Sequence, residues 1–218
     1  MQTQIPIDPD HNCSECPRLR EFILKARAAN PDWHNGPVST FFPEGGMESV
    51  QLLIVGLAPG MRGANRTSRP FTGDYAGDLL YATLKKFDFA TGEYEARPDD
   101  TLKLKHTAIT NAVRCVPPEN KPVGAEINTC RKYLISTLEH LPNLKAIVTL
   151  GKISHDSTVR TLNGRVSQHP FGHNQTTEIG KYTIFPSYHC SRYNTNTGRL
   201  TTEMFEDVLL KVRGYLDA

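Results

Sequence analysis

The sequence lacks the long apolar runs and targeting segments that would indicate a membrane or secreted protein. No stretch approaches the roughly 20 consecutive apolar residues that are needed to cross a bilayer. The first twelve residues, MQTQIPIDPDHN, have no positively charged segment followed by an apolar core, so they do not resemble a secretory signal. The sequence also has no internal repeat and no low-complexity tract. We therefore expect a cytoplasmic protein with no membrane partner.

Cysteine is scarce and odd in number, which argues against a disulfide framework. The five cysteines are Cys13, Cys16, Cys115, Cys130 and Cys190. The C-x2-C pair at the amino terminus, together with the two cysteines far downstream at 115 and 130, suits a four-thiolate site for zinc or for an iron–sulfur cluster. The alternative is a redox pair plus two buried free thiols. We expect Cys190 not to be a ligand.

Length and composition are those of one soluble globular domain. Hydrophobic residues make up 38% and charged residues 22% of the 218 residues, which argues against disorder. A chain of this length is expected to form a single domain over residues 1–218, and we expect a monomer. The formal net charge of +2 permits contact with a polyanion but does not predict one.

Short apolar runs alternate with segments of helical spacing along the chain. The apolar runs predict strands at 51–56, 106–113, 145–151 and 181–187. The helical spacing predicts helices at 17–29, 76–87, 124–141 and 200–216, with irregular structure at 30–49. This alternation predicts an α/β fold with a central, mostly parallel four-stranded sheet that is covered on both faces.

The predicted strand ends point to one ligand site. Gly56, Asn111, Gly151 and Ser187 fall near the carboxyl ends of the four strands. In open parallel sheets ligands bind beyond these ends. We therefore expect the loops that follow these residues to converge on one crevice.

The most informative stretch is GLAPGMRGANRTSRPFTGDYAGD at residues 56–78. It follows a predicted strand and contains five Gly, two Pro and three Arg before a helix begins. Glycines allow backbone to approach a ligand, and loop amides with arginines suit phosphate oxygens. The stretch has neither a P-loop nor a dinucleotide-binding fingerprint. It therefore indicates an anion-binding loop with a candidate carboxylate, Asp74.

With these motifs the chain resembles the family-5 (type B) uracil-DNA glycosylases. The resemblance is carried by GLAPGMRGANRTSRPFTGD at 56–74, ITNAVRCVPPENKP at 109–122 and SYHCSRYNTNTGRLT at 187–201. It implies a three-layer α/β/α fold and hydrolysis of the N-glycosidic bond of uracil, and of other deaminated or modified bases such as hypoxanthine, in single- or double-stranded DNA. The cysteine spacing matches the iron–sulfur members, which implies a 4Fe-4S cluster held by Cys13, Cys16, Cys115 and Cys130.

The resemblance also assigns roles to individual residues. Asp74 matches the catalytic aspartate of the F-T-G-D segment, because Leu57 stands where other branches carry a polar catalytic residue. Asn111 and His189 match the asparagine and histidine of the base pocket, and Phe71 matches the aromatic on which the flipped base stacks. An amide can form hydrogen bonds with the pairing edge of uracil. A carboxylate can offset the positive charge on the sugar, and a hydrogen-bond donor can offset the negative charge on the leaving base.

Further residues complete the expected site. The strand end and following loop are expected to line the base pocket through Gly56, Leu57, Ala58, Pro59 and Gly60. The two arginine-bearing stretches are expected to contact DNA through Arg62, Asn65, Arg66, Arg192 and Arg199. Cys190 stands where many relatives have proline, which removes a backbone restraint beside His189.

Other interpretations stay open at this stage. Phe71 suits core packing, Asn111 a strand-end cap, Asp74 a turn or helix cap and His189 a surface position. An iron–sulfur protein of the same fold that senses DNA damage with little turnover is the main alternative function. A small-molecule enzyme that binds phosphate in the Gly-rich loop is a more distant one.

Overall fold

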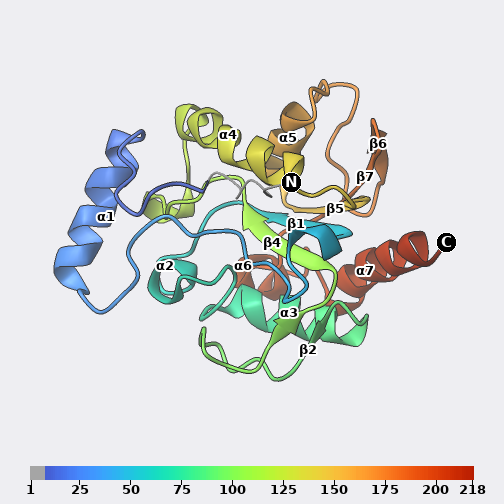
Figure 1. The fold of residues 1–218 in the computed structure, drawn as a ribbon, viewed down its shortest axis with the longest axis horizontal. Helices are drawn as coiled ribbons and strands as arrows, with labels where there is room; N and C mark the ends of the chain where they lie inside the picture. Colours follow the sequence, from blue (N-terminus) through green and yellow to red (C-terminus); the bar gives the residue numbers. More distant parts are fainter. Residues whose placement is uncertain (1–7) are drawn as a thin grey trace.

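A five-stranded sheet lies between two layers of helices in the computed structural model, which describes residues 8–218 (Figure 1). Residues 1–7 of the amino-terminal stretch considered above lie outside the described part. The strand order is β4-β1-β5-β7-β6. The strands are β1 Leu52–Gly56, β4 Thr107–Asn111, β5 Ala146–Leu150, β7 Tyr182–Ser187 and β6 Thr177–Ile179. The first four pair in parallel and β6 pairs antiparallel to β7.

The four predicted strands are confirmed, but the sheet contains a fifth strand that was not predicted. The strands β1, β4 and β5 are buried along their whole length, so each has a continuous apolar or Thr-containing run. The fifth strand, β6, has the sequence TEI, is partly exposed and forms one edge of the sheet. A three-residue edge strand gives no apolar run, so its sequence carried no signal.

Helices cover both faces of the sheet, as the three-layer expectation requires. Figure 1 shows α4 and α5 on one side and α3 and α7 on the other, with α1 beside the sheet. The helices are α1 Pro17–Ala29, α2 Ala64–Thr67, α3 Tyr75–Lys86, α4 Gly124–Glu139, α5 Lys152–Thr161, α6 Arg192–Asn196 and α7 Thr202–Asp217. Of these, α2, α5 and α6 were not predicted. Short 3-10 turns span Met47–Ser49 and Pro118–Asn120, and a two-stranded sheet joins β2 Ala90–Thr91 to β3 Lys103–Leu104.

Alternation along β1 divides the apolar core into two halves. Leu52 and Ile54 pack in the cluster that includes residues of α3 and α7, whereas Leu53 and Val55 pack in the cluster that includes residues of α4. Successive side chains of a strand point to opposite faces of the sheet, so a single buried strand packs against the helices of both layers. None of the helices in the described part of the chain has the length and apolar character needed to span a bilayer.

The start of α3 is packed tightly against the loop that precedes it. Asp74 is the N-cap of this helix, and its side chain accepts a hydrogen bond from the Gly77 backbone N–H. A Cβ atom on Gly77 would overlap the Phe71 carbonyl oxygen and the Tyr94 hydroxyl. The loop therefore reaches this position only because residue 77 has no side chain.

We predict that Gly77→Ala destabilises the protein although Gly77 lies in a helix. Replacing an interior helical glycine by alanine ordinarily stabilises by about 0.5–1 kcal/mol. Here the overlap with backbone should reverse the sign and cost roughly 1–3 kcal/mol. Gly214→Ala in α7 is the matched control, because a Cβ atom added there would have no neighbour within 4 Å. Denaturant unfolding of both variants measures the two free energies, and an equal gain in stability would contradict the prediction.

Candidate active site

A cavity of about 730 Å³ lies where the sequence predicted a crevice. Loops after β1, β4, β5 and β7 all contribute to its lining. The lining includes the expected residues Leu57, Ala58, Pro59, Gly60, Phe71, Asp74, Asn111, His189, Arg192 and Arg199. The carboxyl ends of the parallel strands thus bring together side chains that are more than a hundred positions apart in the chain.

Asn111 lines the cavity, whereas Gly56, which was expected to line it, is not among the lining residues but is paired with Asn111 across β1 and β4. A Cβ atom on Gly56 would overlap Asn111 Oδ1 and would lie 2.6 Å from Phe71 Cζ. A glycine at this strand end therefore lets the amide and the aromatic ring meet. Asn111 is only 3% exposed, and its Oδ1 has no hydrogen-bond partner among the described residues. An unpaired buried acceptor is costly, which indicates that a ligand completes it.

His189 lines the same cavity as Asn111 and Phe71. Its ring is stacked with that of Phe71, with ring centroids 5.9 Å apart and an interplanar angle of 29°. The backbone carbonyl of His189 accepts a 2.8 Å hydrogen bond from Asn194 Nδ2, which fixes the loop. Its Nδ1 is buried without a hydrogen-bond partner in the described part of the chain. Burial lowers the pKa of His189 to about 4, so the imidazole is neutral at pH 7.

Asp74 lines the same cavity while it caps α3. Its Oδ1 accepts from the Gly77 backbone N–H at 3.4 Å, which holds the carboxylate in place. A Cβ atom on Gly60 would lie 2.9 Å from Asp74 Oδ2, and one on Gly63 would overlap that oxygen. Burial raises the pKa of Asp74, and hydrogen bonds from the backbone N–H groups of Gly77 and Ala76 oppose this rise. The helix-cap interpretation and the catalytic interpretation of Asp74 are therefore compatible.

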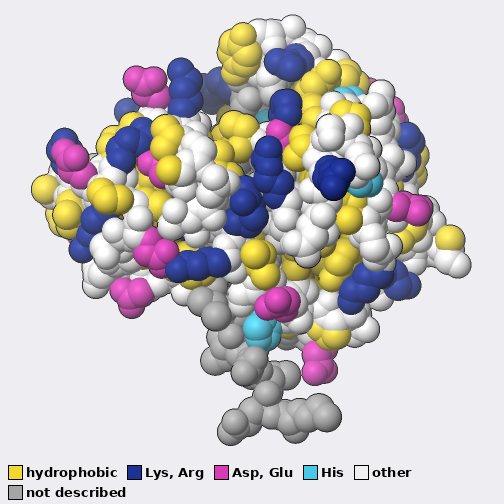
Figure 2. Space-filling view, turned by 90° about the horizontal axis from the view of Figure 1, so that it is seen from above, with side chains coloured by type: hydrophobic (Ala, Val, Ile, Leu, Met, Phe, Trp, Pro, Cys, Tyr) yellow, Lys and Arg dark blue, Asp and Glu magenta, His cyan; other side chains and the backbone are white. Residues whose placement is uncertain are grey.

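Four of the five residues expected to contact DNA are exposed. Arg192 and Arg199 line the cavity, and their guanidinium groups lie over Tyr75 and Tyr188 at 5.2 and 4.8 Å from the ring centroids. Arg62 and Arg66 are exposed on the Gly-rich loop. Figure 2 shows Lys and Arg side chains in the middle of one face and acidic side chains mainly toward its edges, a distribution that suits a polyanion.

The expectation for Asn65 is wrong. Its side chain is fully buried and donates to Asn35 Oδ1 at 2.9 Å and to Met61 Sδ at 3.4 Å. Because this amide is buried and donates its hydrogen bonds inside the protein, it cannot contact a DNA phosphate. A polar residue near two arginines suggests an exposed position, but Asn65 lies on the inner face of the short helix α2.

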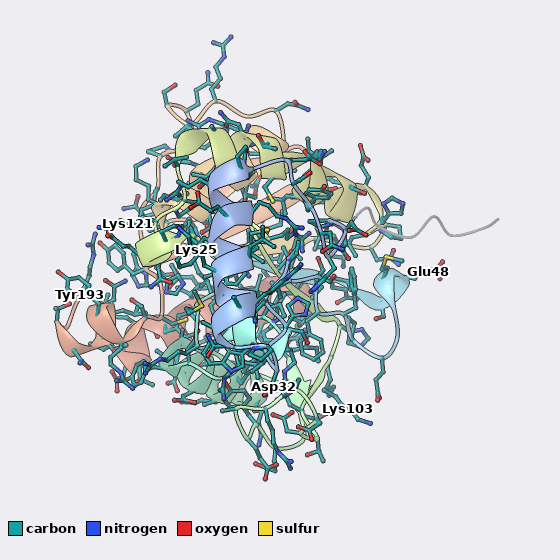
Figure 3. All side chains as sticks on the ribbon, turned by 90° about the vertical axis from the view of Figure 1, so that its left-hand side faces the viewer. Lys25, Asp32, Glu48, Lys103, Lys121 and Tyr193 are labelled. Atoms are coloured by element: carbon teal, nitrogen blue, oxygen red, sulfur yellow. The ribbon has the colours of Figure 1, made fainter. Side chains whose placement is uncertain are left out.

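The cavity also has residues that the sequence did not single out. Tyr188, Phe171 and the first turn of α5 line it, and Tyr193 at its edge is 73% exposed. Figure 3 shows the labelled Tyr193 at the outer edge of the molecule. The only sequence feature that indicated a contribution from the start of α5 was the position of Gly151 at the end of a predicted strand. Phe171 lies in a segment without any recognisable motif.

The four cysteines at 13, 16, 115 and 130 line a second, smaller pocket beside α1. Cys115 and Cys130 are buried, all five thiols are free, and Cys130 Sγ accepts a 3.2 Å hydrogen bond from the Arg114 backbone N–H. Burial raises the pKa of Cys130 to about 11. Across residues 8–218, no three His, Cys, Asp or Glu side chains are arranged to hold a metal ion. Cys190 does not line this pocket, but lies fully buried with its thiol 3.5 Å from the Ala76 carbonyl oxygen.

Comparison with known proteins identifies the family of this site. The family model of the uracil DNA glycosylase superfamily matches residues 42–213. The chain belongs to this superfamily. The type-5 uracil-DNA glycosylase of Thermus thermophilus is 39% identical over 208 residues, which cover 92% of each chain. Type-5 uracil-DNA glycosylases of Mycobacterium bovis and Pyrobaculum aerophilum are 36% and 33% identical and cover 92% and 91% of this chain, and 77% and 86% of their own lengths.

These relatives confirm the resemblance to the type-5 branch of the superfamily. The match covers the three motifs and the cavity that they form, because residues 42–213 include Asp74, Asn111 and His189. The individual roles of these side chains in the superfamily site remain predictions, which the geometry supports by placing them around one cavity.

We predict that the His189 ring titrates near pH 4 rather than near its ordinary value of 6.5. Between these two pH values the unfolded chain binds a proton at this ring and the folded chain does not, so stability contributed by His189 falls as pH falls through this window. NMR titration of the ring carbons measures the pKa, with His189→Gln identifying the signal. A midpoint near 6.5 would contradict the burial of this ring.

Proposed function

We propose that the chain is a monofunctional DNA glycosylase that flips uracil out of DNA and hydrolyses its N-glycosidic bond, which starts base-excision repair. One observation carries this proposal: Asn111 Oδ1 and His189 Nδ1, two buried polar atoms without hydrogen-bond partners among residues 8–218, belong to residues that line the same cavity as the carboxylate of Asp74. Such a cavity is completed by a ligand with both donor and acceptor groups. A nucleobase with a free pairing edge has these groups.

The cavity supplies the contacts that a flipped base needs. The Phe71 ring offers a stacking face, and the Asn111 amide can accept from the uracil N3–H and donate to O4. The neutral His189 ring can donate one hydrogen bond to the base O2 without bringing a positive charge into a buried site. Together these side chains would hold the base while its bond to the sugar is hydrolysed.

The Asp74 carboxylate can offset the positive charge that develops on the sugar. As the bond between the sugar C1′ and the base nitrogen breaks, the electron pair leaves with the base and the sugar becomes cationic. The partly buried carboxylate can stabilise that cation, orient the water whose oxygen bonds to C1′ and accept the proton that this water loses. A hydrogen bond from His189 to O2 stabilises the departing anion. Leu57 has no group for this chemistry, so Asp74 is the carboxylate that the cavity offers near the Gly-rich loop.

The proposed substrate range includes other deaminated or modified bases such as hypoxanthine. Leu57, Ala58 and Pro59 contribute apolar or backbone surface to the cavity, which discriminates less by hydrogen bonding than a polar wall would. The volume of about 730 Å³ leaves room beyond a single pyrimidine ring. We propose that the chain acts as a monomer on single- or double-stranded DNA.

We also propose that Cys13, Cys16, Cys115 and Cys130 hold a 4Fe-4S cluster. Four thiols around one pocket provide the ligands that such a cluster takes, and a cluster holds its ligands farther apart than a single ion does. When bound, the cluster would supply a covalent link between the α1 region and the two downstream segments. The Arg114 backbone N–H that donates to Cys130 Sγ would stabilise the thiolate form.

We predict that Asp74→Asn lowers the single-turnover rate of uracil excision by roughly 10²–10⁴-fold. Asparagine keeps the helix cap, since Asn and Asp cap helices about equally well, so the melting temperature should change little. Asp78→Asn, an exposed position one turn further along α3, is the matched control and should retain the wild-type rate.

The assay uses oligonucleotides with one uracil or one hypoxanthine and enzyme in excess. Rates of Asp74→Asn within about threefold of wild type, far below the acid–base scale, would remove Asp74 from the mechanism. Wild-type protein that binds uracil-containing DNA without releasing base would instead favour the damage-sensor alternative.

We predict that anaerobically purified protein contains about four irons per chain. Cys115→Ser should lose most of the iron and lower the melting temperature, because the link to α1 is lost. Cys190→Ser is the matched control, as it alters a buried thiol outside the pocket and should keep the full iron content. Iron and sulfide analysis measures the cluster directly, and stoichiometric zinc in place of iron would overturn the assignment.

A further inference from the structure

The segment that carries Phe71 and Asp74 has an unfavourable backbone. Phe71 has a φ of +52° and Gly73 a φ of +93°, and Ser68 just before them has a φ of +67°. An aromatic side chain rarely adopts the left-handed region, because Cβ then approaches the following carbonyl oxygen. Such a conformation persists only where the surroundings determine it. Neighbouring groups must therefore hold this turn.

The hydroxyl of Tyr94 bridges the turn from outside. It donates to the Phe71 carbonyl oxygen at 3.1 Å and accepts from the Gly73 backbone N–H at 3.2 Å. These two backbone groups lie on either side of Thr72, and Gly73 directly precedes Asp74. One hydroxyl therefore satisfies both polar groups of the strained turn. The missing side chain of Gly77 is what leaves space for this hydroxyl.

A buried ion pair fixes the loop from which Tyr94 comes. Both oxygens of Asp100 accept hydrogen bonds of 2.7 Å from the Arg69 guanidinium, and the Asp100 side chain is 0% exposed. Asp100 also accepts from the backbone N–H groups of Glu95 and Leu102, which closes the segment that directly follows Tyr94. Arg69 Nε in turn donates to Thr72 Oγ1 at 2.8 Å. The two segments are thus joined on both sides of the turn.

We propose that Tyr94 is a positioning residue that holds Phe71 and Asp74 in the geometry needed for catalysis, with the Arg69–Asp100 pair holding its loop. This inference rests on the proposed function of Asp74. Tyr94 acts through the backbone of residues 71–73, so it does not itself touch the substrate. The role explains why a loop between β2 and β3, outside the central sheet, packs against the catalytic segment.

The test compares Tyr94→Phe with the wild-type chain in single-turnover excision of uracil. Loss of the hydroxyl should lower the maximal rate roughly 10- to 100-fold, the scale for a misplaced catalytic group, and leave half-saturation by DNA within about twofold. Val212→Ala, a buried change in α7, is the control for lost stability and should keep the wild-type rate at a temperature where both variants are folded. In an Asp74→Asn background the same Tyr94→Phe change should cost clearly less than in the wild-type chain, because one of the two groups that Tyr94 positions is gone.

A second measurement does not depend on activity. The Gly73 amide loses its acceptor in Tyr94→Phe, so its hydrogen exchange measured by NMR should accelerate at least about tenfold, and it should not do so in Val212→Ala. A wild-type chain without excision would refute the proposed function, while Gly73 exchange would still show whether Tyr94 holds the turn. Unchanged Gly73 exchange, a Tyr94→Phe rate within about threefold of wild type, or an equal loss in both backgrounds overturns the inference.

Discussion

The parallel pairing of β1, β4, β5 and β7 is the constraint on which the site depends. The register pairs Gly56 with Asn111 and Leu150 with Ser187, so four chain segments end at one edge of the sheet. Buried parallel strands cannot slip by one residue without turning their apolar side chains to the wrong layer. The same packing that separates the two halves of the core therefore fixes where the Asn111 amide lies relative to the loop of His189.

The site combines structural and chemical roles in single residues. Asp74 begins α3 and also supplies the carboxylate, so the position of that carboxylate follows from a helix end rather than from a flexible side chain. Glycines at 56, 60, 63 and 77 leave space for Asn111, Asp74 and the Tyr94 hydroxyl. The composition of the Gly-rich stretch indicates an anion-binding loop, and its glycines also let the Asn111 and Asp74 side chains approach the backbone closely.

The sequence predicted β1 and β5 from their mainly apolar buried runs, and it missed helix α5, whose buried face is mainly polar. The strands at 51–56 and 145–151 were placed within one residue, because each is a continuous buried run. Helix α5 was missed because its buried face carries Ser154 and Thr158, whose hydroxyls donate to carbonyls one turn earlier. Asp74, Asn111 and His189 were assigned to the site through the resemblance of their segments to motifs of the family. Tyr94 and Asp100 have no such motif, since their contribution comes from hydrogen bonds between distant segments.

The cysteine pocket has a consequence for the topology of the unfolded chain. Cys13 and Cys130 line the same pocket, but along the chain they are separated by many elements of the fold, including β1, β4 and the Gly-rich loop. A ligand shared by these thiols would close a ring of roughly a hundred residues, which in the chain-entropy view of disulfides restricts the unfolded state by several kcal/mol. The part of that restriction that involves Cys130 cannot act until this residue of α4 has left the ribosome. Early in synthesis the amino-terminal cysteines would therefore be open thiols, and the fold would gain this source of stability only late in its own biogenesis.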